Sequence, residues 1–492
     1  MVPPLRRSID LPGLSPFAKF PVELLTTIFT EGTKTWRVND AYQLPFPILV
    51  SSICQHWRLV AHGLPGLWNV VFPPLHLLRE KKAAEEWVAL WLGRSGTLSI
   101  SIVMDDNLWK QHHKWAVIWS AAIFGTLEVA RNCFERVERL DIVLNHYNGD
   151  PQKIVDLLNS MGAGDWPLIQ LSLILPSRPS VQHDMYSIRG FPLLRRFRGA
   201  RILPPNLQNL RSVSIRDLQA PIEDSLDFLK SAPQLETLVL LEAQFSINAA
   251  IQQRLAATQP VKLLRLKVLA LRTKRRHSRF YGSTGLLFPF AFCQIPDLQY
   301  LELDMPKTLT AIFGESLASC TIDKLRLSNS RPSNYPTQSD REFLQLLVSK
   351  SRNLEIVHFP LSDLLFSWTT SETLNRRTVF IGQFNETNTE QYLGLKSIML
   401  ISDNVVDARY LCQFVVFNPS VEEFLFSLAT RNNLANLFKH DKQILLKPTM
   451  FSEEHSNVEE WLRQTGNLII VTPSVGLLER ERTAPRGELV DR

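Results

Sequence analysis

Leu235-Glu-Thr-Leu238-Val-Leu240 and Leu298-Gln-Tyr-Leu301-Glu-Leu303 follow one short pattern, with apolar residues at the first, fourth and sixth positions. The chain holds ten copies of this pattern, and their starts average about 32 residues apart. A repeat of that length decides the architecture, because a single unit cannot bury its apolar face without its neighbours. The ten copies begin at Val137, Leu168, Leu210, Leu235, Leu266, Leu298, Ile322, Leu354, Leu395 and Val421.

Helical patterns separate several of these short strands. The segments Ile222–Ala232, Arg341–Lys350 and Ala408–Phe417 carry apolar residues at helical spacing and end at polar or proline turns. Strand and helix in alternation predict an α/β fold, a solenoid with parallel strands on one side and helices on the other. The alternative is that six-residue patterns of this kind arise by chance in a leucine-rich chain.

This alternation resembles the leucine-rich-repeat horseshoe, which carries its parallel strands inside and its helices outside. In the regular family an Asn or Cys stands three positions after the third apolar residue and bonds the backbone of the turn. Only Asn145 fits that position among the ten copies, so the resemblance is to an irregular leucine-rich repeat. A degraded copy starts at Leu194, and an apolar run at Ile444 is not completed and is not counted.

The segment Phe20–Val71 is rich in helical patterns and stands apart from the repeat. Pro21 suits the first position of a helix, where its missing N–H costs nothing. A second helix is expected over residues 49–61, with its own apolar stripe, and Gly63 is placed to end it. One face of the first helix should carry Leu24, Leu25, Ile28 and Phe29.

These two helices resemble the F-box, whose signature is Leu-Pro-x-Glu-Leu/Ile-Leu-x-x-Ile-Phe followed by Val-Cys-basic-x-Trp-Arg. The departures are Phe20 for Leu, Gln55 for a basic residue, and extra residues around 35–46, an insert familiar in the fungal branch of the family. Residues 90–100 are similar to a Leu, Arg-Ser-Gly, Leu-Ser-Leu segment that follows the F-box in many fungal members. The residues that match the signature are Pro21, Glu23, Leu24, Leu25, Ile28, Phe29, Ile53, Cys54, Trp57 and Arg58.

The resemblance implies a substrate receptor of a Skp–cullin–F-box ubiquitin ligase, without chemistry of its own. An F-box docks on a Skp-type adaptor, which binds a cullin, while the other domain holds a target protein. A unit of about 50 residues cannot bury this many large apolar groups internally, so part of the stripe should face a partner. The alternative is a helical cap whose apolar residues are all core. Adaptor contacts are expected from Pro21, Leu24, Leu25, Ile28, Ile53, Cys54 and Trp57.

The target-binding surface is expected on the concave side, where residues between the apolar strand positions point. These side chains carry both signs of charge, which favours a protein partner over a phosphate backbone. The alternative is that each is only solvated. They include Arg216, Arg272, Tyr300, Glu302, Asp304, Lys324, Arg326 and His358.

Composition is that of an ordinary globular protein, with 45% hydrophobic residues, 21% charged residues and a net charge of +6. The five cysteines are far apart and form no C-x-x-C pair, which fits a reducing compartment. No segment suits a signal peptide or a membrane span, so we expect a cytoplasmic or nuclear protein without a membrane partner. Motifs for nucleotide, metal and serine-nucleophile sites are absent from the sequence, so we expect neither a cofactor nor an enzyme.

Three regions are therefore expected: an F-box-like helical domain over 1–75, the irregular solenoid over 76–475, and a polar, disordered tail over 476–492. The basic run 274–279 is either a solvated loop or a patch for nuclear import or anions. Two other functions remain open. One is a repeat scaffold that has lost adaptor binding, through Gln55 or the insert, and the other is a basic solenoid that binds nucleic acid, which we do not expect.

Overall fold

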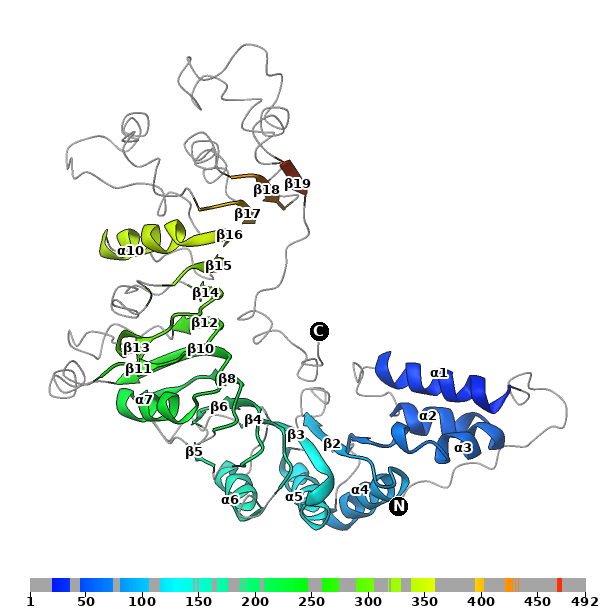
Figure 1. Cartoon of the computed structure of the whole chain (residues 1–492). Helices are drawn as coiled ribbons and strands as arrows, with labels where there is room; N and C mark the ends of the chain where they lie inside the picture. Colours follow the sequence, from blue (N-terminus) through cyan, green and yellow to red (C-terminus); the bar gives the residue numbers. More distant parts are fainter. Residues whose placement is uncertain are drawn as a thin grey trace. The chain divides into compact units, whose positions relative to one another are not determined.

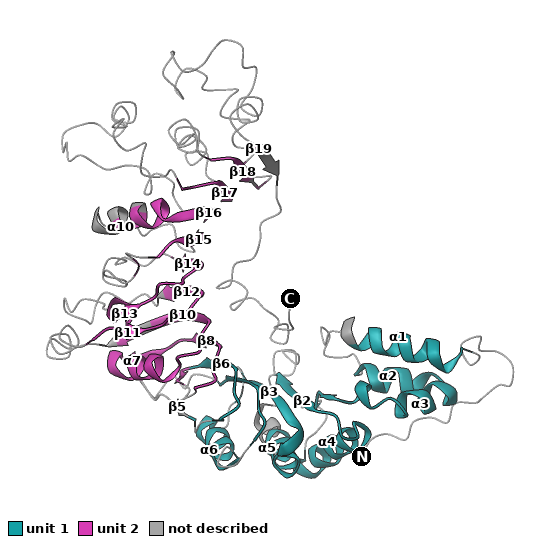
Figure 2. Ribbon diagram, viewed as in Figure 1, with its two compact units in different colours: residues 1–200, 484–492 teal, residues 201–483 magenta. Residues whose placement is uncertain are grey.

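The computed structural model describes residues 20–35, 45–73, 80–105, 116–144, 147, 150–161, 166–175, 186–188, 191–203, 208–246, 259–273, 289–304, 317, 320–328, 338–358, 394–401, 421–427, 430, 432 and 467–470. Two compact units divide the chain, residues 1–200 with 484–492 and residues 201–483 (Figure 2). The expected helix at 408–417, the basic run at 274–279, the apolar run at Ile444 and the tail after 476 lie outside the described residues.

The first unit begins with helices and continues with alternating helices and strands (Figure 1). Its strands β1, β2, β3, β4 and β6 pair in parallel, in chain order, and α4, α5 and α6 lie on one side of them. The elements are α1 (Val22–Thr35), α2 (Phe46–Ile53), α3 (Gln55–His62), η2 (Pro65–Leu67), β1 (Val70–Val71), α4 (Lys81–Arg94), β2 (Ile100–Asp105), α5 (Ala116–Asn132), η4 (Phe134–Arg136), β3 (Val137–Val143), α6 (Pro151–Met161), β4 (Gln170–Ile174), β5 (Tyr186–Ser187) and β6 (Arg196–Ala200).

The second unit continues the same theme with a longer run of parallel strands. From β8 to β19 the main strands again pair in chain order, and α7 and α10 lie on one side of them (Figure 1). The elements are β7 (Ile202–Leu203), β8 (Ser212–Arg216), β9 (Gln219–Pro221), α7 (Ile222–Ser231), β10 (Thr237–Ser246), β11 (Val261–Lys262), β12 (Val268–Thr273), η5 (Pro289–Phe292), β13 (Cys293–Gln294), β14 (Tyr300–Asp304), β15 (Ile322–Ser328), α10 (Gln338–Ser349), β16 (Ser351–Val357), β17 (Ser397–Ile401), β18 (Glu423–Phe426) and β19 (Asn467–Ile470).

The six-residue pattern is the core of these strands. Leu298, Leu301 and Leu303 are all 0% exposed, and each of the ten copies leads into or overlaps a parallel strand. The degraded copy at Leu194 leads into β6. The predicted α/β class with parallel strands is therefore confirmed, because the apolar positions pack on the helix side while the residues between them face away.

The copy of the six-residue pattern predicted to begin at Leu354 begins three residues earlier. The pairing of β15 with β16 sets Leu325 opposite Leu354 and Ile322 opposite Ser351, so the copy begins at Ser351 and not at Leu354. Ser351 is buried, and its hydroxyl donates a 2.9 Å hydrogen bond to the carbonyl of Val348 at the end of α10. This partner lets a polar residue occupy a core position.

The turn that follows several strands has a shared backbone geometry. Arg201, Asp217 and His358 directly follow β6, β8 and β16 and have positive φ values between 51° and 60°. Glu242, with a φ of 60°, lies inside β10 where its register against β12 shifts. Each of the three strand-end residues donates its backbone N–H to a carbonyl of the next strand: Arg201 to Arg216, Asp217 to Leu241 and His358 to Ile401. In two copies the position expected to hold Asn carries a buried apolar residue, Leu218 or Ala243. The strand ends are therefore fastened by backbone hydrogen bonds and apolar burial.

Candidate functional site

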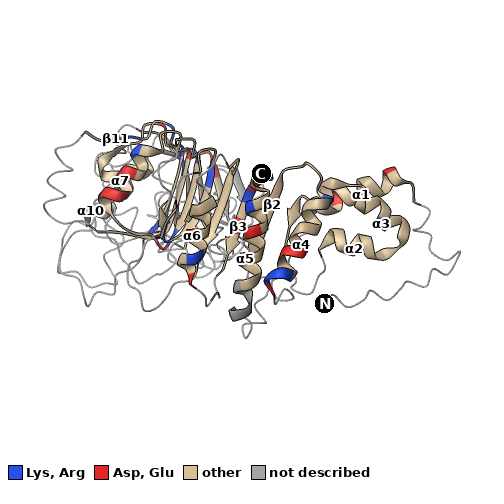
Figure 3. Cartoon of the chain, turned by 90° about the horizontal axis from the view of Figure 1, so that it is seen from below, with Lys and Arg blue, Asp and Glu red and all other residues tan. Residues whose placement is uncertain are grey.

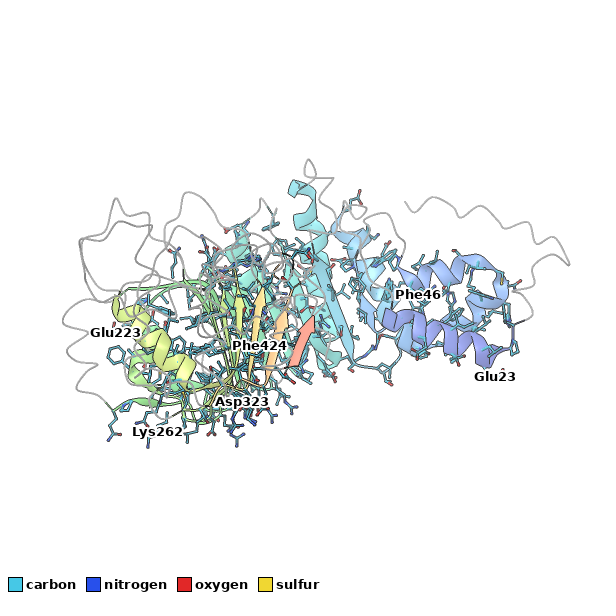
Figure 4. The ribbon with its side chains drawn as sticks, turned by 90° about the horizontal axis from the view of Figure 1, so that it is seen from above. Glu23, Phe46, Glu223, Lys262, Asp323 and Phe424 are labelled. Carbon is cyan, nitrogen blue, oxygen red and sulfur yellow. The ribbon has the colours of Figure 1, made fainter. Side chains whose placement is uncertain are left out.

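The helices α1, α2 and α3 form a small group held by a narrow core. Leu25 and Phe29 of α1, one turn apart, are buried, and Phe29 contacts Trp57 of α3 edge to face at 5.2 Å. Near the other end of α1, Gly32 lies against the ring of Phe46, which begins α2. Figure 4 labels Glu23 near one end of α1 and Phe46 toward the other. Only a thin stripe of α1 is therefore used for internal packing.

The expected second helix over 49–61 is two helices. Cys54 has an extended backbone (φ −156°, ψ 172°) between α2 and α3. Its Sγ accepts a 3.5 Å hydrogen bond from the N–H of Trp57, and Arg58 donates from Nε to the carbonyl of Ser51 at 2.9 Å. The expectation of one helix was wrong because side chains at Cys54 and Arg58 satisfy backbone groups that a continuous helix would pair itself.

Two apolar pairs on these helices are left in solvent. Leu24 and Ile28 on α1 are 51% and 47% exposed, and Leu49 and Ile53 on α2 are each 46% exposed. Members of each pair are four residues apart, so each pair lies on one face of its helix. The same helices carry few charged side chains (Figure 3), so these faces resemble interface cores more than ordinary solvated surface.

The residues expected to bind an adaptor are divided by this arrangement. Pro21, Leu24, Ile28 and Ile53 are exposed, whereas Leu25 is completely buried. Cys54 and Trp57 are half-buried, one as a helix cap and the other as a core ring. Sequence reasoning missed three exposed apolar residues: Val22, Leu49 and Leu59. Leu49 stands four residues before Ile53 and so shares a helix face with it, a spacing that could have identified Leu49 from the sequence.

A tryptophan joins the helical group to α4. Trp68 is completely buried, donates from its indole nitrogen to the carbonyl of Ala61 at 2.9 Å, and packs edge to face on Trp91 at 5.0 Å. The guanidinium of Arg94 stacks 4.3 Å from the centre of the Trp68 ring. Nearby, burial and the charges of Arg94 and Arg58 lower the pKa of His62.

The Arg94-Ser95-Gly96 segment has a structural role. Gly96 has a φ of +61° just after α4, a geometry that glycine adopts without strain. Arg136 reaches back to this turn, donating to the Ser95 hydroxyl at 2.6 Å and to the carbonyl of Leu98 at 3.1 Å. Ser95 is fully buried, so this turn is a fixed connection between α4 and β2.

The strand face opposite the helices in the second unit holds a set of ion pairs. Arg272 on β12 pairs with Asp304 on β14. Arg326 on β15 lies between Glu302 on β14, at 3.5 Å, and Glu355 on β16. Lys324 adds a 2.6 Å contact to Glu355. We call these six residues the charge ladder; they carry three positive and three negative groups, so the ladder has no net charge.

The exposure expected for several ladder residues was wrong. Arg272, Glu302, Asp304 and Arg326 are between 1% and 9% exposed, because opposite charges on adjacent strands satisfy one another in the sheet face. Glu355, which sequence reasoning missed, is 1% exposed. Its role could have been found only with the copy correctly begun at Ser351. These side chains hold one another and offer little surface to a partner.

The other residues expected to bind a target lie in different settings. Tyr300, the first residue of β14, and Lys324, the third residue of β15, are half-buried. The hydroxyl of Tyr300 donates to Glu302 at 3.0 Å. Arg216 is half-buried at the end of β8. His358 is exposed, but it stands in the positive-φ turn after β16. Arg216 and His358 lie at the ends of their strands, outside the ladder. The predicted target-binding residues that the structure brings together in the ladder are Arg272, Glu302, Asp304, Lys324 and Arg326.

Within the described residues, no group of three or more His, Cys, Asp or Glu side chains is placed to hold a metal ion, and no helix is long and apolar enough to cross a membrane. No family model matches the chain, and no curated protein matches it. The described residues thus present exposed apolar side chains on α1–α3 and buried ion pairs on the strands of the second unit.

Proposed function

We propose that the chain is an F-box-type substrate receptor, in which α1–α3 dock a Skp-type adaptor and irregular leucine-rich repeats hold a target protein. The adaptor would connect the chain to a cullin and hence to a ubiquitin ligase. The proposal rests on the F-box signature between Pro21 and Arg58 together with the position of the exposed apolar residues on the helices that carry it.

The observation that carries the proposal is the concentration of exposed apolar side chains. Six of the eleven large hydrophobic residues that are exposed among the described residues fall between Val22 and Leu59. Apolar side chains scattered singly need no explanation, but a group on neighbouring helices marks a protein-binding surface. Leu24, Ile28, Leu49 and Ile53 would be the anchors, and Leu25 and Phe29 would support them from the core.

The test is co-purification of the full chain with a Skp-type adaptor. The double variant Leu24→Asp and Ile28→Asp should abolish binding, since both side chains are about half exposed and their replacement leaves the core of α1 intact. Leu264→Asp with Leu346→Asp is the matched control, because these residues are 55% and 45% exposed in the second unit. Substituting Leu25 would not serve, because that side chain is buried and its loss would test folding instead.

The result expected is adaptor binding by the wild type and the control, and none by the α1 variant with unchanged circular dichroism. A well-folded wild type that fails to bind would contradict the proposal. It would leave a protein-binding repeat scaffold whose N-terminal helices are a cap.

A further inference from the structure

One position in the second unit is charged in almost every strand. It is the residue directly before the first paired, face-away residue of each strand, and we call this row the strand-start rim. Backbone hydrogen bonds and strand pairing place its members side by side. In each of four neighbouring pairs a backbone N–H donates to a backbone carbonyl: Glu236 to Arg211, Lys267 to Glu236, Gln299 to Lys267, and Glu422 to Lys396. The row consists of Arg211, Glu236, Lys267, Gln299, Asp323, Arg352, Lys396 and Glu422.

Composition does not account for this row. Seven of its eight residues are charged, against 21% of the whole chain. All are exposed except Glu236, which is half-buried. Two ion pairs within the row, Arg211 with Glu236 at 3.7 Å and Arg352 with Asp323 at 3.4 Å, join side chains that are 38% to 62% exposed. Such pairs contribute little to stability, so these charges are available to a partner.

The matching row in the first unit has another character. There Ile169 donates its N–H to Glu138, and Arg195 donates to Ile169, so an apolar residue stands between the two charges. Strand pairing does not require a charged residue at every such position, because β4 pairs with β3 and β6 with the apolar Ile169 there. Strand pairing alone therefore does not explain why seven of the eight positions in the second unit are charged.

We infer that the strand-start rim is the surface on which the second unit binds a partner protein, and that the charge ladder beside it is internal scaffold. The inference rests on the proposed role of the repeats in holding a target. The rim reads plus, minus, plus, neutral, minus, plus, plus, minus from Arg211 to Glu422, at about 5 Å from strand to strand. A phosphate backbone needs a row of one sign, whereas a protein surface can present the complementary order of both signs.

Gln299 offers a probe that leaves this order of charges unchanged. It is exposed, it is the neutral member of the rim, and it lies between Lys267 and Asp323; Figure 4 labels Asp323 at this end of the strands. We would place a photoreactive benzoylphenylalanine at Gln299 in the full chain, expressed in its native cells, and irradiate. The same group at Asp227, 73% exposed on α7, is the matched control on the helix side.

A protein adduct at Gln299 and none at Asp227 is the expected result. Exchanging the neighbouring signs through Lys267→Glu with Asp323→Lys keeps the net charge and should lower the adduct yield about tenfold, because two attractive contacts become repulsive. No adduct at Gln299, equal adducts at both positions, an adduct removed by nuclease, or a yield unchanged by the exchange would each overturn the inference.

The measurement also separates this inference from adaptor docking. In the Leu24→Asp and Ile28→Asp chain the Gln299 adduct should persist, since those residues belong to α1 in the first unit. An adduct at Gln299 in a wild-type chain that binds no adaptor would support partner binding at the rim and contradict the proposed ligase role. Adaptor binding without any adduct at Gln299 would support adaptor docking and contradict partner binding at the rim.

Discussion

Arg272 and Asp304 stand directly opposite each other on β12 and β14, and their side chains form a buried ion pair on the strand face opposite the helices. The two residues are 32 positions apart in the chain. Neither has more than 9% of its surface exposed. A buried pair of this kind adds little over an apolar pair of the same size, but removing one partner leaves an uncompensated charge.

We predict that Asp304→Ala lowers the free energy of unfolding by about 3–5 kcal/mol, because Arg272 is left buried without its carboxylate. Urea unfolding followed by tryptophan fluorescence would measure the change. Asp323→Ala is the control: its pair with Arg352 is more than half exposed, so the loss should stay within about 1 kcal/mol. Replacing both partners, Arg272→Met with Asp304→Leu, should recover most of the stability. Equal losses for Asp304→Ala and Asp323→Ala would contradict the structural role of the ladder.

The apolar pattern was sufficient to predict the strands. Leu298, Leu301 and Leu303 are buried where the pattern places them, and β14 follows in the expected parallel arrangement. The pattern works because the apolar positions can be read from each strand separately, even though neighbouring units are needed to bury them. The pattern did not identify Ser351, because this polar residue occupies a position that is apolar in the other copies and its hydroxyl bonds a backbone carbonyl. The predicted start of that copy was therefore Leu354, three residues too late.

The charged side chains could not be placed in the same way. Glu302 and Arg326 look like solvated residues until the register of β14 against β15 sets them side by side, and that register depends on both strands at once. Similarly, the stripe on α1 predicted an apolar face but not its division into buried Leu25 and exposed Leu24. That division depends on where α3 packs, which helical periodicity alone does not determine.

Gly32→Ala should destabilise the helical group. An added Cβ at Gly32 would overlap the ring of Phe46, and overpacking of this kind costs about 1–3 kcal/mol. Gly93→Ala is the matched control, since that glycine also lies in a helix, α4, and has no atom within 4 Å of the added Cβ. It should be neutral or stabilising by up to about 1 kcal/mol. Urea unfolding of the two variants checks the difference, and Gly32→Ala with Phe46→Ala should recover part of the loss.

Cys293 should resist alkylation in the native chain. Burial raises the pKa of its thiol to about 12, and its Sγ donates to the carbonyl of Pro289 at 3.2 Å. At pH 8 the thiol is therefore neutral and enclosed, so iodoacetamide should label it only after urea is added. Because the folded pKa lies above the ordinary value of 9.0, its contribution to stability is present below pH 9 and is lost as the pH rises toward 12. Mass spectrometry of labelled peptides would show labelling in the native chain if the burial were wrong.

The positive-φ turn after β16 gives a prediction in which two variants have opposite effects. His358 has a φ of 51° and is exposed, and its N–H donates to Ile401 at 2.8 Å. Glycine adopts this backbone conformation freely, whereas a β-branched residue does not. We therefore expect His358→Val to be less stable than His358→Gly by about 1–2 kcal/mol in urea unfolding. Both variants lose the imidazole, so their difference isolates the backbone conformation.

Lys396 supplies the matched position for this comparison. It is exposed directly before β17 and has no positive φ. There the order should reverse, because glycine in an extended segment costs about 0.5–1 kcal/mol in unfolded-state entropy and valine does not. The same order at both positions would mean that His358 is not held in the left-handed region. The opposite orders would show that the turn after β16, like those at Arg201 and Asp217, fixes where a strand ends by backbone conformation.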